Sequence, residues 1–243
     1  MTKHSSTVGG STAGRVLACP ASYELCKTMP EEPESPYAAE GTALHQAMEV
    51  CLNEGYAPFT EDTQGLIGVE FYGVTITPEH ISTCIDPALR QFDEIYSEYD
   101  QDPGGAQYKL EQRVEFHGIP DAFGTLDVVL WTSSRVVFFD WKFGGGVLVV
   151  AFDNASMLYY GTAAVCSMPS ILTFPDLPFG EVPVELVIVQ PRVNGEEPSR
   201  WLTDDARLQE FRRELTVAFS KATSPHPPYA RGDHCRWCTA KPV

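Results

Sequence analysis

The stretch GTLDVVLWTSSRVVFFDWK, from Gly124 to Lys142, decides the fold. Two runs rich in Val, Leu, Phe and Trp flank a polar break at Thr132, Ser133 and Ser134. This pattern is typical of two β-strands joined by a turn. The turn contains either two residues, Ser133 and Ser134, or four residues, from Thr132 to Arg135. Both alternatives predict the same strand register. The sequence therefore predicts a β-hairpin whose register does not depend on the choice of turn.

In that register Asp127 lies directly opposite Asp140. Side chains alternate along a strand, so Asp127, Asp140 and Lys142 share one face. Directly opposed residues have Cβ atoms roughly 4.5–5.5 Å apart, and like charges at that separation are destabilising. Two carboxylates among apolar neighbours need a cation between them, or one must be protonated. A divalent metal is the simplest solution, with Lys142 able to position a water or neutralise developing charge.

Three motifs in order resemble the PD-(D/E)XK nucleases. Asp127 followed after twelve residues by Asp140-Trp141-Lys142 is similar to their active-site hairpin. EGTALH, from Glu40 to His45, resembles the Gly-Thr-x-x-His helix start of the RecB-type exonuclease branch. Asn154 to Tyr160 occupies the place of that branch's Gln-x-x-x-Tyr motif, with Ser156 where Gln is expected. The likeness extends from LACPASYEL to HCRWC and is greatest to phage and prophage members that end in a Cys-x-x-Cys segment.

The resemblance implies roles for named residues. Asp127, Asp140, the carbonyl of Trp141 and His45 would hold Mg²⁺ or Mn²⁺, and Lys142 would orient the attacking water. Glu111 resembles an additional acidic residue that many of these nucleases carry before the hairpin, and Tyr160 the motif tyrosine.

Each of these assignments has a structural alternative. Without the adjacent Gly41-Thr42, His45 would be interpreted as a histidine packed between helices rather than a neutral imidazole ligand. Glu111 is equally well interpreted as an exposed carboxylate of an edge strand, and Tyr160 as a core tyrosine. Glu40 is expected to be a helix N-terminal acid favoured by the helix dipole.

The segments predict an α/β fold. Helix, three strands, helix and strand follow one another, the αβββαβ order of the restriction-endonuclease-like core, a mixed sheet flanked by helices. We expect one domain over residues 1–243. It comprises an N-terminal helical elaboration (14–105), a catalytic core (106–222) and a Cys-containing tail (223–243). The strands are expected near 108–116 and 184–190, with helices at 78–99, from about 154 to 168, and at 203–222.

Composition limits the class of protein. At 243 residues and 43% hydrophobic, the chain can bury a full core. It contains no apolar run of about 20 residues and no signal-peptide core, so we expect no membrane partner. The expected compartment is the cytoplasm, which is the host cell cytoplasm if the chain is phage-encoded. The net charge of −16 is unusual for a DNA-binding protein, because affinity for DNA comes largely from Lys and Arg.

Seven cysteines at irregular spacings argue against a disulfide framework. Cys235 and Cys238 form one Cys-x-x-Cys motif, which supplies only two of the four ligands of a closed site. In RecB-like relatives with a [4Fe–4S] cluster, one cysteine comes from the N-terminal segment, and Cys19 matches it. A fourth matching cysteine is not evident; Cys26 or His234 could substitute, but neither matches the pattern. The alternative is an unmetallated tail with two reactive thiols.

The function expected from the resemblance is a metal-dependent DNA exonuclease of phage recombination or DNA processing. Its partner would be DNA, together with a single-strand annealing or recombination protein. The competing interpretation is a noncatalytic DNA-binding or assembly protein on a nuclease fold. The acidic balance and the absent Gln favour this alternative, whereas the intact set of Asp127, Asp140 and Lys142 opposes it. A Zn-ribbon interaction module would explain the tail alone.

Overall fold

A five-stranded mixed sheet forms the centre of the protein. The computed structural model describes residues 7–30, 33, 35–169, 172, 181–195 and 197–241. The strands lie side by side in the order β3 (Gln107–Glu115), β4 (Phe123–Trp131), β5 (Val136–Trp141), β6 (Pro183–Val189) and β7 (Ser199–Asp204). Among the strands that the structure describes in this sheet, only β5 and β6 form a parallel pair. The α/β fold predicted from the sequence is therefore observed.

The β4–β5 hairpin has the predicted register. Val128 pairs with Phe139 and Trp131 with Val136, and the connection is the four-residue loop from Thr132 to Arg135. The amide of Thr132 donates to the carbonyl of Arg135 at 3.1 Å and closes this loop. Every residue of β5 is buried, as expected for a central strand covered on both faces.

The predicted element order is also observed. The helix α6 (Asp86–Tyr99) precedes β3, β4 and β5, and α7 (Ala155–Ser167) connects them to β6. The sequence did not predict β7, because Thr203 and Asp204 were assigned to the last helix. In the structure α9 (Asp205–Ala222) begins after them, since the Asp204 carboxylate accepts from the amide of Arg207 at 2.9 Å and caps the helix.

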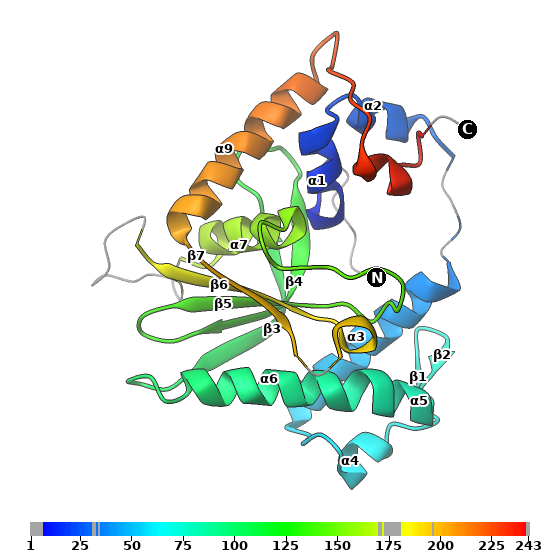
Figure 1. Ribbon diagram of the computed structural model, residues 1–243, viewed down its shortest axis with the longest axis vertical. Helices are drawn as coiled ribbons and strands as arrows, with labels where there is room; N and C mark the ends of the chain where they lie inside the picture. The colour runs from blue at the N-terminus through cyan, green and yellow to red at the C-terminus, as the bar shows by residue number, and fades with distance from the viewer. Residues whose placement is uncertain are drawn as a thin grey trace.

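Two apolar clusters cover the two faces of the sheet. Residues of α1 (Gly10–Ala18), α7 and α9 pack on one face, and residues of α3 (Pro36–Glu54) and α6 pack on the other. Figure 1 shows these helices on opposite sides of the sheet. Neighbouring side chains of β5 take part in different clusters: Phe138 in the first and Phe139 in the second. Because side chains alternate along a strand, the continuous apolar sequence of β5 contributes to the apolar cluster on each face of the sheet.

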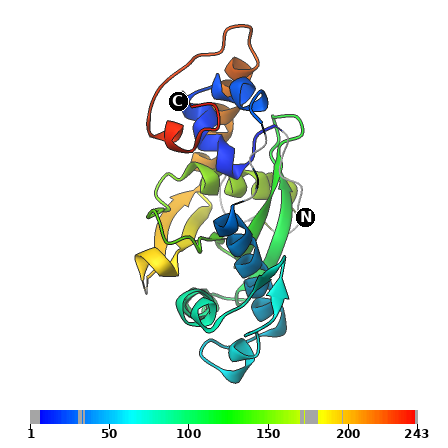
Figure 2. The same cartoon turned by 90° about the vertical axis from the view of Figure 1, so that its right-hand side faces the viewer.

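The N-terminal half is mainly helical. After α1 come α2 (Ser22–Lys27), α3 and α4 (Glu61–Gln64), then a small hairpin of β1 (Glu70–Phe71) and β2 (Val74–Thr75). The helix predicted over 78–99 is α5 (Pro78–His80), a π-helical turn (Ile81–Ile85) and α6 in succession. In the side view of Figure 2, α3 runs down the middle of the molecule with the β1–β2 hairpin beside it.

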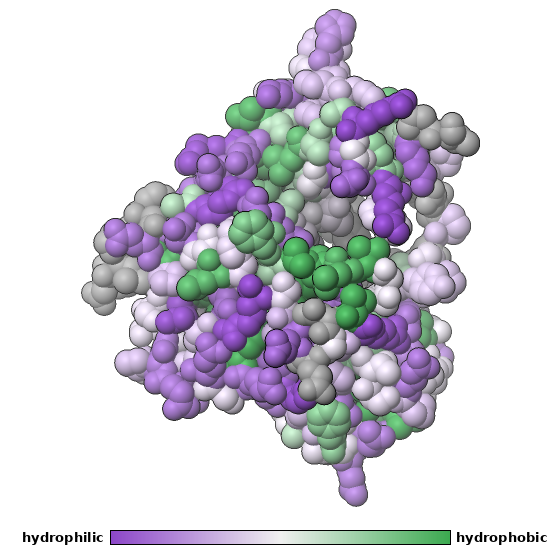
Figure 3. Space-filling view, in the orientation of Figure 1, coloured by the Kyte–Doolittle hydropathy of each residue, from purple (hydrophilic) through white to green (hydrophobic). Residues whose placement is uncertain are grey.

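The remaining segments connect or end the chain. The short helix α8 (Pro191–Asn194) follows β6, and a 3₁₀ turn (Asp233–Trp237) in the tail packs near α1. The segment between β5 and α7 exposes apolar side chains of Val147, Leu148, Val150 and Phe152, and Figure 3 shows an apolar patch where this segment crosses the molecule. Within the part of the chain that the structure describes, no helix is long and apolar enough to span a bilayer.

Candidate metal-dependent active site

One cavity of about 660 Å³ collects the side chains singled out by the sequence. It opens between α3 and the hairpin, with contributions from α1, α7 and β3. The predicted site residues that line it are His45, Glu111, Asp127, Asp140, Lys142 and Tyr160. Strand, helix and loop segments far apart in the chain therefore meet at one polar depression.

Three of these residues have the arrangement of metal ligands. One ligand atom each from His45, Glu111 and Asp127 lie within 4.8 Å of one another. The Asp127 carboxylate is oriented by the amide of Trp141, which donates to its Oδ2 at 2.8 Å. The opposite oxygen, Oδ1, lies 3.4 Å from Nδ1 of His45. Oxygen ligands suit Mg²⁺, and one imidazole among carboxylates also suits Mn²⁺, so the donor set fits the expected metals.

The hydrogen bonds of His45 support a cation at this point. Its Nε2 lies 3.1 Å from the Trp141 carbonyl, which can only accept, so Nε2 must carry a proton. In a neutral imidazole Nδ1 would then turn a lone pair toward the Asp127 carboxylate. Two acceptors facing each other are unfavourable, so a proton or a metal ion is required between them. Burial opposes charging of the ring, but the carboxylates of Asp127 and then Asp140 outweigh it and raise the pKa of His45 to about 9.

Asp140 and Lys142 form the second part of the site. The Lys142 ammonium lies 2.6 Å from the Asp140 carboxylate. Burial raises the pKa of Asp140, and the neighbouring Asp127 adds to this effect despite the lysine. For Lys142, burial is outweighed by the charges of Asp140 and Asp127, so its pKa is raised and the amine stays protonated. The ion pair thus keeps a cation beside the candidate metal ligands.

Glu111 interrupts an otherwise regular ladder. Leu110 pairs with Val128 and Gln112 with Leu126, whereas Glu111 between them has a left-handed φ of 47° and is not paired in the ladder. A non-glycine residue in this conformation is strained, and such strain is frequent at functional sites. Burial, followed by the charge of Asp127, raises the pKa of Glu111 to about 7. Glu111 lies on the edge strand β3, as expected if it were an exposed edge carboxylate. It nevertheless lines the cavity together with the carboxylates of Asp127 and Asp140.

Tyr160 closes the cavity from α7. A Cβ atom at Gly10 or Gly124 would lie 2.5 Å or 2.7 Å from its ring, so both positions require glycine for the ring to fit. Burial raises the pKa of Tyr160. Ser156, one turn earlier on α7, also lines the cavity in the position where the resembled family has Gln.

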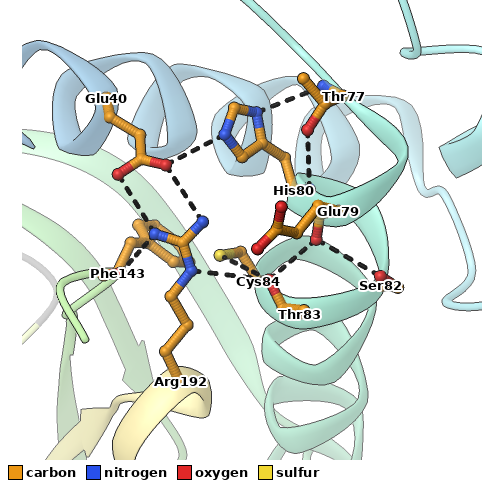
Figure 4. Close-up of polar contacts among 9 residues, drawn as sticks. All are labelled: Glu40, Thr77, Glu79, His80, Ser82, Thr83, Cys84, Phe143 and Arg192. Atoms are coloured by element: carbon orange, nitrogen blue, oxygen red, sulfur yellow. Dashed lines mark hydrogen bonds and ion pairs between the residues drawn. The ribbon is translucent and has the colours of Figure 1, made fainter.

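A polar network that the sequence did not predict holds α3 against the segment that follows β5. Glu40 was expected to act through the helix dipole, but its carboxylate binds the Arg192 guanidinium through two contacts of 3.0 and 3.1 Å. Glu40 also contacts Nε2 of His80 at 3.0 Å, and Arg192 donates to the carbonyl of Phe143 at 3.2 Å (Figure 4). Arg192 therefore connects the helix of His45 to the residue after Lys142. No local sequence signal marks Arg192 for this role.

Gln190, also missed, shapes the glycine-rich segment after Lys142. This buried side chain donates to the carbonyls of Gly144 and Val147 and accepts from the amide of Val149 at 2.9 Å. A Cβ atom built at Gly144, Gly145 or Gly146 meets nothing within 4 Å, so the space above these glycines is open.

The predicted cysteine site is assembled only in part. Sγ of Cys19 accepts from the amide of Ala230 at 3.5 Å, so the N-terminal segment and the tail do meet. The sulfur of Cys26 lies 3.6 Å from that of Cys238. Among the described residues, the one group of three ligand atoms close enough for a metal is that of His45, Glu111 and Asp127. A [4Fe–4S] cluster holds its cysteine sulfurs further apart than a single ion does, because each sulfur binds a different iron. The [4Fe–4S] assignment of Cys19, Cys235 and Cys238 therefore stays a prediction.

Comparison with known proteins provides a family. The chain belongs to the family described as "Protein of unknown function (DUF2800)", which matches residues 4–243. It is also similar to a solved structure described as "Crystal structure of SSO0001". That match has 9% sequence identity and a TM-score of 0.30, and covers 95% of this chain and 96% of the other. Similarity at this level supports no inference about fold or activity.

Proposed function

We propose that this chain is a divalent-metal-dependent deoxyribonuclease, an exonuclease of DNA recombination or processing. The proposal is supported by one observation above all: His45, Glu111 and Asp127 present ligand atoms within 4.8 Å of one another in a cavity that also contains Lys142. Two carboxylates, an imidazole and a lysine together provide what phosphodiester hydrolysis requires, namely a metal site and an adjacent cation.

The residues have separable roles in the proposed reaction. Asp127, Glu111 and His45 would hold Mg²⁺ or Mn²⁺, with Asp140 completing the negative site. The bound metal supplies Lewis-acid stabilisation of the scissile phosphate and lowers the pKa of a bound water. Lys142, held by Asp140 at 2.6 Å, donates hydrogen bonds that orient the attacking water and offset negative charge on the phosphate. Metal binding requires His45 to lose the proton shared with Asp127, so metal affinity rises with pH.

The negative charge of the cavity also determines how a substrate phosphate can bind. Glu49, Glu111, Asp127 and Asp140 line it, while Lys142 and His45 are the basic residues among its described lining. A phosphate cannot enter such a site favourably unless a metal first neutralises part of the charge. The proposed enzyme therefore binds the reacting phosphate in a metal-dependent way. A recombination protein that anneals single strands is a suitable partner, because it would add affinity for the DNA.

The test is digestion of 5′- and 3′-labelled linear and circular DNA with Mg²⁺, Mn²⁺ or EDTA. We expect metal-dependent loss of linear DNA from an end, with circular DNA spared. Asp140→Asn should lose cleavage and keep the melting temperature of the metal-free protein. DNA binding without cleavage under every metal condition would favour the noncatalytic alternative, which the net charge of −16 and Ser156 at the expected Gln position support.

A further inference from the structure

An aromatic side chain stands at the mouth of the proposed active site on the tip of a small hairpin. Strands β1 and β2 pair through Phe71 and Val74, which leaves Tyr72 and Gly73 as a two-residue turn. Their φ angles of 50° and 80° are both left-handed, as a type I′ turn requires. Asn and Gly are favoured in such turns, whereas a bulky residue is disfavoured. Local turn preference therefore does not explain a tyrosine at this position.

The hairpin positions Tyr72 over the cavity. Phe71 packs against the apolar cluster between α3 and α6, which anchors the hairpin. Tyr72 instead is 56% exposed and lines the same cavity as His45 and Asp127. Its hydroxyl donates to Oε1 of Gln46 at 3.1 Å, and Gln46 is the residue after His45 on α3. A partly exposed aromatic ring is thus held next to the helix that supplies a candidate metal ligand.

The charges of the cavity limit what else can bind a nucleic acid there. The described lining contains four carboxylates and no arginine, so contacts to phosphates contribute little affinity beyond the metal. Proteins that bind single strands obtain the remaining affinity by stacking bases on aromatic side chains. A base that stacks on a side chain must have one face free of a neighbouring base, as at the end of a single strand. An exposed tyrosine beside the metal site meets this requirement.

We propose that Tyr72 is a stacking platform for an unpaired nucleobase of single-stranded DNA, adjacent to the phosphate that would bind the metal ion held by His45 and Asp127. This inference rests on the proposed nuclease function and specifies its substrate as a single-stranded end. Gln46 positions the ring through its hydrogen bond, and Gln46 is in turn held by Glu49 at 2.6 Å. The hydroxyl of Tyr72 orients the platform, while the face of the ring provides the binding energy.

The experiment measures binding of a short single-stranded oligonucleotide that carries 2-aminopurine near its end. Ca²⁺ replaces Mg²⁺, because Ca²⁺ accepts looser oxygen coordination and allows binding to be separated from hydrolysis. Stacking on Tyr72 should quench the 2-aminopurine fluorescence. Tyr72→Ala should weaken binding by about tenfold to a hundredfold, the range that corresponds to one stacked base. Tyr72→Phe should stay within about threefold of the wild type, because the ring remains.

The matched control is Tyr229→Ala, since Tyr229 in the tail is 53% exposed and does not line the cavity. Equal binding by Tyr72→Ala and wild type would overturn the proposal. Equal losses in Tyr72→Ala, Tyr72→Phe and Gln46→Ala would also overturn it, because they would assign Tyr72 to anchoring the hairpin.

The two proposals fail in different ways. Quenching that depends on Tyr72 without any cleavage in Mg²⁺ or Mn²⁺ would contradict the nuclease and retain the platform. Cleavage of single-stranded ends with unchanged binding by Tyr72→Ala would retain the nuclease and remove the platform. Melting temperatures of all variants check that the fold is intact.

Discussion

The β4–β5 hairpin and the cysteine-containing ends of the chain differ in how they bring residues together. In the hairpin, the Asp127 carboxylate accepts a hydrogen bond from the backbone amide of Trp141, 14 positions later. The regular pairing of β4 with β5 next to it brings the two residues together. At the ends, Cys26 and Cys238 approach across 212 positions, through the packing of separate segments. The hairpin register was predicted correctly. The sulfur that contacts Cys238 is that of Cys26, which the sequence offered only as a substitute for a fourth ligand.

The difference shows what a sequence pattern can specify. A strand register permits only discrete alternatives, and a slip of one residue would exchange the two faces of β4. Segments that pack without a ladder have no such discrete register. The pattern of cysteines therefore indicates that the ends meet, without specifying which sulfur atoms come into contact.

Removing a hairpin carboxylate should have the largest effect. Asp127→Asn deletes the charge that faces His45 and should lower the cleavage rate by about a thousandfold, since metal stabilisation is worth several kcal/mol. Single-turnover cleavage with saturating Mn²⁺ measures this. The control is Asp62→Asn, an exposed carboxylate on α4. Cleavage by Asp127→Asn within tenfold of wild type would show that the hairpin carboxylates do not bind the metal.

Lys142→Met should have the next largest effect and separates chemistry from metal binding. The loss of the ammonium beside Asp140 removes the donor that orients water, and we expect turnover to fall by about a hundredfold. Mn²⁺ affinity should stay equal or increase, because a positive charge leaves the site. Mn²⁺ titration followed by electron paramagnetic resonance provides the second readout. Weaker metal binding with unchanged turnover would contradict these roles.

The contact between Arg192 and Glu40 joins α8 to α3, which are distant in the sequence. Its removal tests how much this packing stabilises the fold. Arg192→Met leaves the Glu40 carboxylate without its two-contact partner and should lower the free energy of unfolding by about 2 kcal/mol. Arg213→Met, on the exposed face of α9, is the control. The double variant Glu40→Gln/Arg192→Met should lose less than the sum of the single variants. Strict additivity would show that the pair is not coupled.

The same pair predicts a pH dependence. The hydrogen bonds from Arg192 outweigh burial and lower the pKa of Glu40 from its usual value of 4.5. The folded protein thus binds this proton less readily than the unfolded chain. The stabilisation is fully present above pH 4.5 and is lost as the pH falls through the lowered pKa. Denaturation of wild type and Glu40→Gln across this interval should converge at low pH, and a constant difference would contradict the assignment.

The cysteines should affect the active site least. The Sγ atoms of Cys26 and Cys238 are 3.6 Å apart, so diamide should remove two electrons and two protons from the thiols and join them as a disulfide. Peptide mass analysis identifies the bridge, which Cys238→Ser should abolish and Cys19→Ser should retain. Cleavage activity should change by less than about twofold, because none of these cysteines lines the cavity. A bridge from Cys19 instead would contradict the observed contact.

The predicted cluster has its own test. Anaerobically purified protein with iron and sulfide bound, lost in Cys19→Ser, would support the [4Fe–4S] prediction. Iron-free protein that cleaves DNA normally would contradict the cluster and leave the proposed nuclease site unaffected.

The sequence by itself determined the hairpin, its register and the shared face of Asp127, Asp140 and Lys142. It also predicted the order from α6 through β3, β4, β5 and α7 to β6, and the helix of His45. These features depend on the alternation of side chains along a strand, on helix caps and on turn residues. All three act over a few positions of the sequence. The overlooked strand β7 is short and half-exposed, and its last residues coincide with an acidic helix start.

Only the tertiary structure decided which distant groups complete the site. The strained backbone of Glu111, the contact of Arg192 with Glu40, the Gln190 contacts and the position of Tyr72 all join segments without a common ladder. Such contacts follow from how two apolar clusters pack on the faces of the sheet. Many sequences with the same local patterns could pack differently, because side-chain volume and shape choose among the arrangements.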